Sequence, residues 1–368
     1  MPKVLVFKET ILPPSETFII AQMRSLRRYT PSFVGLEPTP RSLPLDSTPL
    51  LLSSQPTKIA DFRSKIYRRI GIAPLFHERV KALHVDLIHA HFACGGQTIL
   101  PLRRKLKVPL VVSLHGGSDV PVDTTHRGIY RDVASEADLF ICVSDFMRNE
   151  AIKAGYPPEK LLLHYIGIDL TFFSPQPEPA NDRNILFIGR LVERKGCEYA
   201  LRAVKLLEHD CPEAHLTVIG DGPLRTQLEL LARELGVNAT FLGVQTPEAV
   251  REHLRRARVF CLPSVLTSDG DSEGLGMVFA EAQAMGVPVV STFHGGIPEV
   301  VRHEETGLLC PERNSDALAE ALERLINDSE LHATFRKEGV RHISERFDLE
   351  HQTAKLEEIY DSARAQVK

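Results

Sequence analysis

The chain has 368 residues, which is long enough for two domains, each with its own hydrophobic core. Hydrophobic residues make up 43% and charged residues 25% of it, as in ordinary globular proteins, and no run of 18 apolar residues predicts a membrane-spanning helix. Six cysteines are scattered without a Cys-x-x-Cys pair, so we expect free thiols in a reducing compartment and a cytoplasmic protein.

The net charge of −4 is unevenly divided along the chain. Residues 1–170 contain 22 Lys and Arg against 16 Asp and Glu, whereas the remaining residues contain 22 against 32. A basic first half and an acidic second half predict that the two halves meet different partners.

Short apolar segments alternate with longer amphipathic segments through the first half, a pattern typical of α/β proteins with parallel sheets. We predict strands near residues 3–7, 85–89, 109–114, 138–143 and 161–166, and helices near 16–28, 58–70, 96–106, 125–136 and 145–154. The segment 38–56, rich in Pro, Ser, Thr and Leu, is predicted to be a long surface loop.

Three prolines within five residues predict a linker over residues 174–182, and a second α/β series follows it. Its strands are predicted near 184–189, 215–219, 239–242, 258–262 and 287–291, its helices near 196–208, 223–235, 247–256 and 277–285, and a closing helix near 348–364. The predicted fold class is therefore α/β, with two Rossmann-like lobes over residues 1–175 and 183–347 whose parallel sheets face each other across a cleft.

Two carboxylates in the second half, Glu273 and Glu281, stand eight positions apart around a glycine turn, Gly274-Leu275-Gly276. A glycine-rich turn at a helix N-terminus offers backbone N–H groups and a positive dipole end to a phosphate. Glu273 is placed to accept hydrogen bonds from hydroxyls beside that phosphate, and Glu281 from a second diol. A phosphate between two hydroxyl-bearing rings is typical of a nucleotide sugar.

Arg190 and Lys195 follow the predicted strand that ends at Gly189. Two cations at the end of a strand are suited to bind a diphosphate and to stabilise the charge that develops when it leaves. The alternative is ordinary surface charge, which is common for an Arg-x4-Lys pair.

These residues belong to a set of four motifs in the second half of the chain. In order, the motifs are GRLVERKG (Gly189 to Gly196), IGDGPLR (Ile219 to Arg225), FCLPS (Phe260 to Ser264) and EGLGMVFAEAQAMGVPVV (Glu273 to Val290). The set resembles the retaining family-4 glycosyltransferases of the GT-B fold, and the SETFI segment near the N-terminus is similar to exopolysaccharide and colanic-acid-type members. The resemblance implies that the last helix, about 348–368, crosses back onto the first lobe.

The resemblance also implies roles for single residues. Arg190 and Lys195 would bind the diphosphate, Glu273 would lie near the donor sugar, and Glu281 would bind the ribose hydroxyls. His115, in the segment SLHGGSD, would lie next to the donor sugar from the first lobe. Val244 would lie beside the base. Asp119, in the same segment as His115, would bind substrate, with a turn or cap role as the alternative, and Glu16 would meet the acceptor, with a helix start as the alternative.

The implied reaction moves a hexosyl group from a nucleoside diphosphate sugar to a saccharide or lipid-linked saccharide acceptor in polysaccharide or glycan biosynthesis. No metal cofactor is expected, because fixed cations replace a divalent metal. No nucleic acid partner is expected either. Two alternatives stay open: a nucleotide-sugar epimerase on the same fold, and a non-catalytic nucleotide-binding subunit of a glycan-assembling complex.

Residues 58–70 raise the question of a peripheral membrane contact. Ile59, Phe62, Ile66 and Ile70 share one face of the predicted helix, and four cations lie mostly off that face. The helix either lies on an anionic membrane surface or packs its apolar face on its own lobe with the basic face in solvent; we expect the second.

Overall fold

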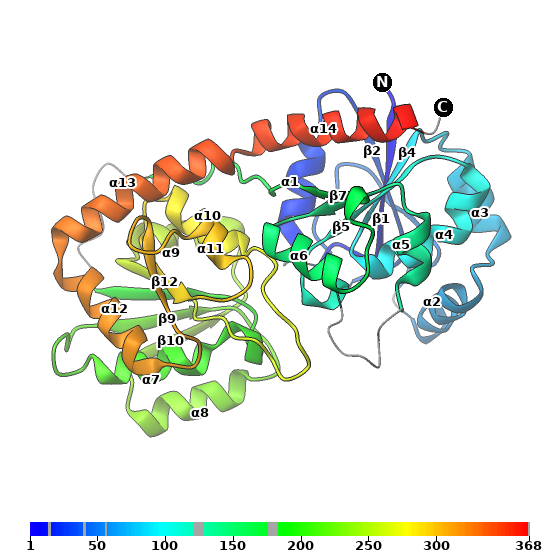
Figure 1. Ribbon diagram of the computed structural model, residues 1–368. Helices are drawn as coiled ribbons and strands as arrows, with labels where there is room; N and C mark the ends of the chain where they lie inside the picture. Colours follow the sequence, from blue (N-terminus) through cyan, green and yellow to red (C-terminus); the bar gives the residue numbers. More distant parts are fainter. Residues whose placement is uncertain (14–15, 40–41, 56, 121–128, 176–182, 367–368) are drawn as a thin grey trace. The chain divides into compact units, whose positions relative to one another are not determined.

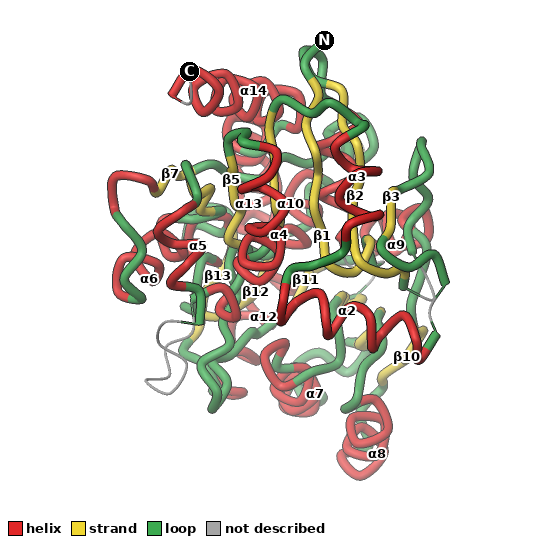
Figure 2. The backbone as a smooth tube through the Cα atoms, turned by 90° about the vertical axis from the view of Figure 1, so that its right-hand side faces the viewer, coloured by secondary structure: helices red, strands yellow, loops and turns green. Residues whose placement is uncertain are grey.

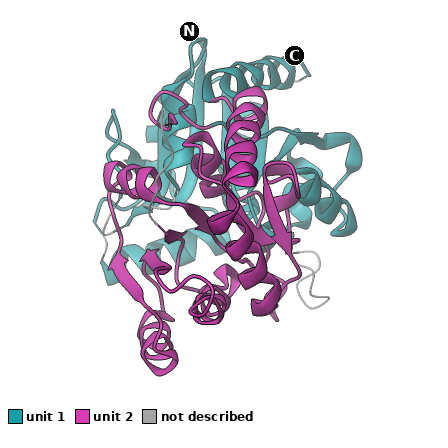
Figure 3. Cartoon of the chain, turned by 90° about the vertical axis from the view of Figure 1, so that its left-hand side faces the viewer, with its two compact units in different colours: residues 1–167, 349–368 teal, residues 168–348 magenta. Residues whose placement is uncertain are grey.

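The computed structural model describes residues 1–13, 16–39, 42–55, 57–120, 129–175 and 183–366. The chain divides into two compact units: Met1–Gly167 with Leu349–Lys368 form unit 1, and Ile168–Asp348 form unit 2 (Figure 3). Unit 1 therefore ends earlier than the predicted boundary at residue 175. The reason is local, since the Ile168 N–H donates to the carbonyl oxygen of Phe347 at 2.8 Å within unit 2. Most of the predicted linker lies outside the described residues.

Unit 1 is built on a parallel sheet that has seven strands in the described residues, in the order β3-β2-β1-β4-β5-β6-β7 (Figure 1). The strands are β1 (Lys3–Ile11), β2 (Thr30–Pro38), β3 (Leu50–Leu51), β4 (Leu87–His91), β5 (Leu110–Leu114), β6 (Leu139–Cys142) and β7 (Leu161–Leu163). The helices are α1 (Thr17–Arg24), α2 (Lys58–Ile70), α3 (Pro74–Lys81), α4 (Ala93–Leu106), α5 (Arg131–Glu136), α6 (Asp145–Lys153) and α14 (Leu349–Gln366). Every residue of β4 and β5 is buried, as expected of central strands covered on both faces.

Three elements of unit 1 are absent from the sequence prediction: β2, β3 and α3. Prolines at positions 31 and 38 and a central glycine weaken the strand pattern of β2, yet it pairs with β1 along its length. Gly35 is needed there, because a Cβ atom would lie 2.5 Å from the carbonyl oxygen of Lys8. The predicted loop over 38–56 is partly wrong, since β3 pairs with β2 inside it.

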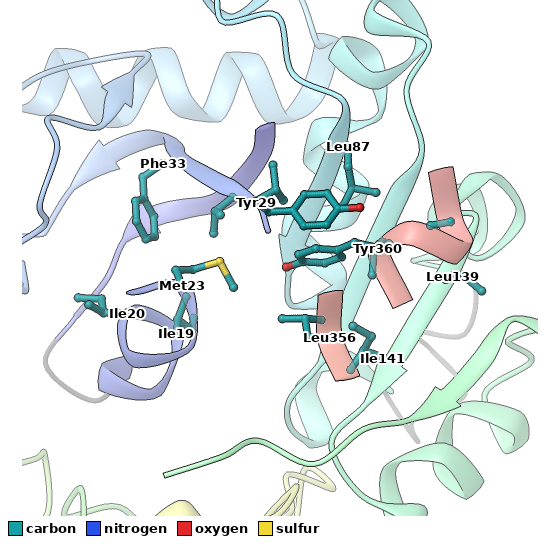
Figure 4. Close-up of a cluster of buried hydrophobic side chains, with 14 of the residues drawn as sticks. Ile19, Ile20, Met23, Tyr29, Phe33, Leu87, Leu139, Ile141, Leu356 and Tyr360 are labelled. Carbon is teal, nitrogen blue, oxygen red and sulfur yellow. The ribbon is translucent and has the colours of Figure 1, made fainter. Parts of the chain in front are cut away.

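The C-terminal helix α14 completes the core of unit 1. Leu356, Tyr360 and Ala363 of α14 are fully buried in one cluster with side chains of α1 and of the sheet (Figure 4). The rings of Tyr29 and Tyr360 meet edge to face at 5.1 Å, and the Tyr360 hydroxyl is 2.7 Å from Nδ1 of His89 in β4. The predicted return of the last helix to the first lobe is confirmed.

Unit 2 is built on a second parallel sheet, which in the described residues has six strands in the order β10-β9-β8-β11-β12-β13. The strands are β8 (Asn184–Ile188), β9 (His215–Ile219), β10 (Ala239–Gly243), β11 (Val259–Cys261), β12 (Val289–Thr292) and β13 (Gly307–Cys310). The helices are α7 (Cys197–Leu206), α8 (Arg225–Leu235), α9 (Pro247–Arg256), α10 (Met277–Ala284), α11 (Ile297–Val300), α12 (Ser315–Asn327) and α13 (Ser329–Arg346). The α/β class with two parallel-sheet lobes is confirmed, although β13, α11, α12 and α13 were not predicted.

We predict that Tyr360→Ala destabilises unit 1 by about 3–5 kcal/mol, because it empties a buried aromatic site and leaves Nδ1 of His89 without its partner. Urea denaturation combined with hydrogen exchange of the α14 amides measures the change. Ser362→Ala, at an exposed position of the same helix, is the control. Equal stability of the two variants would contradict a role of α14 in the core of unit 1.

Candidate active site

The sheet of unit 2 has a switch point between β8 and β11, where the strand order reverses. In open parallel sheets the carboxyl ends of the two strands at such a point diverge and leave room for a ligand. The segment after β8 carries Arg190 and Lys195, and the segment after β11 leads to Glu273. The residues singled out in these motifs therefore come to one edge of one sheet.

A tight turn after β8 brings Lys195 to this edge. Glu193–Lys195 form a single 3-10 turn that ends at Gly196, whose φ is +62°. A Cβ atom at Gly196 would lie 1.9 Å from the carbonyl oxygen of Pro263 in the segment after β11. Only glycine allows both this backbone conformation and this close approach of the two segments.

Lys195 forms an ion pair with Glu273, and both side chains are largely buried, with 13% and 11% of their surfaces exposed. Burial opposes ionisation of the Glu273 carboxyl, but the charges of Lys195 and Arg194 outweigh it and lower its pKa to about 2. Glu273 is therefore a carboxylate throughout the physiological pH range. It presents acceptors for hydroxyl groups beside a fixed cation.

The backbone of Glu273 is held from the segment after β12. Its N–H donates to Nε2 of His294 at 3.0 Å, and its carbonyl oxygen accepts from the N–H of Gly296 at 3.0 Å. Because Nε2 of His294 accepts, the ring proton is on Nδ1, which donates to Oε1 of Glu312 at 2.7 Å. Gly295, with φ of +56°, permits the turn, since a Cβ atom there would lie 2.2 Å from the carbonyl oxygen of Glu273.

Sequence reasoning missed His294 and Glu312. The signal for His294 was present, because it lies directly before the glycine turn that follows β12. Glu312 follows β13, a strand that was not predicted, so nothing in the sequence connected it with Glu273.

Helix α10 starts directly after the glycine turn, at Gly276 with φ of +84°. Leu275 is buried, so what the turn offers a ligand is backbone and not this side chain. Glu281 lies in the second turn of α10, and no described residue donates a hydrogen bond to its carboxyl group. Burial raises its pKa to about 7. A partly protonated carboxyl without a partner is suited to pair with the hydroxyl groups of a ligand.

Arg190 and Val244 are exposed. Arg190 follows the end of β8, at the predicted edge of the sheet. It forms no ion pair with any described residue, Glu273 included. Of the two predicted cations, Lys195 contacts Glu273 and Arg190 is exposed, so their joint binding of a diphosphate stays a prediction. Val244, directly after β10, is 50% exposed and leaves an apolar surface at the same edge.

In unit 1, His115 follows β5 and belongs to a group of aromatic rings. Its ring stacks on His91 at 5.2 Å, and Nε2 of His115 is 3.0 Å from Nδ1 of His91. Burial lowers the pKa of both rings well below the usual value, so both are neutral at pH 7. Nδ1 of His115 is buried and has no partner among the described residues. No three His, Cys, Asp or Glu side chains in the described part of the chain gather as a metal site.

Asp119 has a structural use in unit 1. Its buried carboxylate accepts the backbone N–H groups of Ala93 at 2.7 Å, His115 at 2.6 Å and Gly116 at 3.3 Å. These bonds fix the segment that carries His115. The geometry therefore favours the turn role over substrate binding, and the predicted substrate contact of Asp119 is corrected.

Glu16 starts α1 and is buried, with Oε1 at 2.9 Å from Nζ of Lys8. Burial raises its pKa, and Lys8 opposes that shift. Its second oxygen has no partner among the described residues. The predicted contact with an acceptor stays a prediction.

We predict that His294→Ala lowers the free energy of unfolding of unit 2 by about 1–3 kcal/mol, because the buried Glu273 N–H loses its acceptor. Hydrogen exchange of the β12 amides in urea measures the change. His209→Ala, at a side chain that is 93% exposed, is the control. If both variants are equally stable, His294 does not hold Glu273 in place.

Two family models match the chain. The model described as Glycosyltransferase Family 4 matches residues 31–172, and the model described as Glycosyl transferases group 1 matches residues 170–342. Together they cover most of both units.

The chain is 33% identical over 268 residues to WcaL, a colanic acid biosynthesis glycosyltransferase of Escherichia coli strain K12. The matched region covers 69% of this chain and 65% of WcaL. It is 31% identical over 253 residues to AmsK, an amylovoran biosynthesis glycosyltransferase of Erwinia amylovora, which covers 67% and 62%. The chain thus spans a little under two thirds of the length of these curated relatives.

The solved structure of HepE from Anabaena with UDP and glucose matches with a TM-score of 0.79 at 20% identity, over 98% of this chain and 100% of that chain. This likeness concerns the fold. The two family models show the family, and the likeness to HepE shows the fold: the chain belongs to the family-4 glycosyltransferases of the GT-B fold.

Proposed function

We propose that this protein is a retaining glycosyltransferase that moves a sugar from a nucleoside diphosphate sugar to a saccharide or lipid-linked saccharide acceptor. The observation that carries the proposal is the buried Lys195–Glu273 ion pair at the switch point of the unit 2 sheet. It puts a cation for phosphate and a carboxylate for sugar hydroxyls side by side at the edge where such folds bind ligands.

The diphosphate is bound by positive charge from three sources. Lys195 uses one N–H on Glu273 and retains two for phosphate oxygens. Arg190 adds a guanidinium, which binds phosphate through paired N–H groups. The start of α10 adds the positive end of the helix dipole.

The two rings beside the diphosphate are bound by carboxyl groups. Glu273, fully ionised, accepts from hydroxyls of the donor sugar, and Glu281 accepts from the ribose hydroxyls. The base packs on the exposed side chain of Val244. HepE was solved with UDP, and that nucleotide is one candidate for this chain.

The chemistry needs no covalent nucleophile from the protein. The bond between the anomeric carbon and the diphosphate oxygen breaks, the acceptor oxygen bonds to that carbon on the same face, and the acceptor proton passes to the leaving diphosphate. Lys195 and Arg190 stabilise the charge on the leaving group, the role that a divalent metal has in other transferases.

The acceptor class is proposed from the relatives. WcaL and AmsK are named for the biosynthesis of the polysaccharides colanic acid and amylovoran. A saccharide acceptor in polysaccharide assembly follows for this chain. Incubation with donor alone separates this reaction from epimerisation, which gives an isomerised sugar. Incubation with and without acceptor separates it from a non-catalytic subunit, which gives no acceptor-dependent release of diphosphate. The anomeric configuration of the product, determined by NMR, tests retention.

We predict that Lys195→Ala lowers kcat about 10²–10³-fold, because charge on the leaving diphosphate loses its buried cation. Release of UDP or GDP from a panel of nucleotide sugars with saccharide acceptors measures the rate. Lys205→Ala, at an exposed ion pair on α7, is the control and retains wild-type kcat. Turnover of Lys195→Ala near that of the control would contradict the proposed role.

We predict that binding of the intact nucleotide sugar releases protons through Glu281. Its carboxyl group has a pKa of about 7 in the free protein, and hydrogen bonds from ribose hydroxyls favour the ionised form. Roughly half a proton is then released at pH 7, close to one at pH 6 and almost none at pH 8.5. Calorimetry in buffers of different ionisation enthalpy measures this number.

Glu281→Gln abolishes the proton release, whereas Glu320→Gln, at an exposed position of α12, retains it. The sign can also be checked without ligand. Because the folded pKa lies above the ordinary 4.5, wild-type stability falls relative to Glu281→Gln as pH rises from about 4.5 through 7. A pH-independent difference between the two proteins would show that Glu281 does not titrate in this range.

A further inference from the structure

The apolar face of α2 is exposed, contrary to the expectation that it packs on its own lobe. The exposed fractions are 72% for Ile59, 63% for Phe62, 38% for Ile66 and 54% for Ile70. Helix α2, labelled in Figure 2, buries a face that consists of Ala60, Ser64 and Tyr67. At 100° per residue, the centre of this buried face is about 120° around the helix from the apolar stripe.

These residues form a concentrated patch. Six of the fourteen large hydrophobic residues that are exposed among the described residues lie between positions 59 and 75, since Ile72 and Leu75 follow the helix with 63% and 76% exposed. Scattered exposed hydrophobic residues need no explanation, but a contiguous stripe on one helix marks a surface that is covered in use. We call Ile59, Phe62, Ile66 and Ile70 the α2 stripe.

Cations border the α2 stripe on both sides. Arg63 lies on the side toward the buried face, and Lys58 and Arg69 lie on the other side. All three are exposed, and none forms an ion pair with a described residue. Lys65 and Arg68 are different, since they pair with carboxylates within unit 1.

The helix is fixed before any partner arrives. The Thr57 hydroxyl caps its first turn by accepting the Ala60 N–H at 3.1 Å, and the Tyr67 hydroxyl lies 3.0 Å from Nε2 of His77. Gly71 ends the helix with φ of +64°, and a Cβ atom there would lie 2.3 Å from Pro101. Binding through the α2 stripe therefore needs no folding of the segment, which removes an entropic cost.

We propose that the α2 stripe docks this protein on an anionic lipid bilayer, with the helix lying in the plane of the interface. The helix of 13 residues is about 20 Å long and inserts its apolar side among the acyl chains while the bordering cations bind lipid phosphates. An anionic surface fits this helix because the charged positions that border the stripe carry only cations, and its one carboxylate, Asp61, lies off the border and pairs with Lys65. No helix in the described part of the chain is long and apolar enough to cross the bilayer.

The place of α2 in unit 1 gives the docking a consequence. Arg68 in its last turn is 3.1 Å from Glu9 of β1 and 3.5 Å from Glu37 of β2. Both carboxylates are near the carboxyl ends of their strands, the edge at which Glu16 and His115 follow β1 and β5. Docking brings this edge of unit 1 to the membrane surface, where a lipid-linked acceptor would be found.

Vesicle sedimentation without nucleotide sugar tests the docking independently of the proposed function. The probe is a vesicle of phosphatidylglycerol and phosphatidylcholine, compared with phosphatidylcholine alone. Phe62→Gln with Ile66→Gln lowers the partition coefficient at least about tenfold, because two apolar side chains no longer insert. Arg63→Gln with Arg69→Gln lowers it about fivefold for each cation removed, on anionic vesicles only.

The matched control is Leu206→Gln with Leu230→Gln, two leucines of unit 2 that are 48% and 50% exposed. This variant binds like the wild type. Unchanged melting temperatures show that the variants fold, as expected for exposed positions. The proposal is overturned if the wild type fails to bind anionic vesicles, if the control loses binding as strongly as the stripe variant, or if sedimentation velocity shows the stripe buried in a dimer that Phe62→Gln with Ile66→Gln dissociates.

Discussion

The site of unit 2 depends on the close approach of the segments after β8 and β11. A buried ammonium and a buried carboxylate meet there, and each would be strongly unfavourable alone. They meet because Gly196 lets the backbone of one segment touch Pro263 of the other, at a distance that no side chain would permit. The ion pair therefore results from a backbone constraint, and the ligand-binding chemistry proposed above requires that constraint to hold.

The two carboxyl groups have opposite properties, although burial acts to raise the pKa of both. Glu273 lies beside Lys195 and Arg194, whose charges lower its pKa to about 2. Glu281 has no such cation among the described residues, and burial raises its pKa to about 7. One group is a permanent anion and the other changes its charge near neutrality. Eight residues of sequence separate two identical side chains, and only their surroundings distinguish them.

The sequence predicted the parts of the fold and the site that depend on local patterns. Glycine turns after buried strands located Lys195, Glu273 and Glu281, and parallel strands imply that such turns share one edge of a sheet. It did not predict that His294 and Glu312 hold Glu273 in place. His294 is 21 residues from Glu273 and 18 from Glu312, and Glu312 follows β13, a strand that was not predicted. For Asp119 the sequence left a substrate contact and a turn role open, because its spacing to His115 does not reveal that three N–H groups occupy its carboxylate.

Helix α2 shows most clearly what periodicity leaves undetermined. Its bounds, 58–70, were predicted correctly, yet the apolar spacing was taken to mark the face that packs on the protein. The unit instead buries a narrow face of Ala60, Ser64 and Tyr67, where small side chains let the helix approach closely and one tyrosine reaches His77. The α2 stripe is explained by a partner outside the chain, and the unpaired cations on its borders indicate that this partner is negatively charged, as an anionic bilayer is.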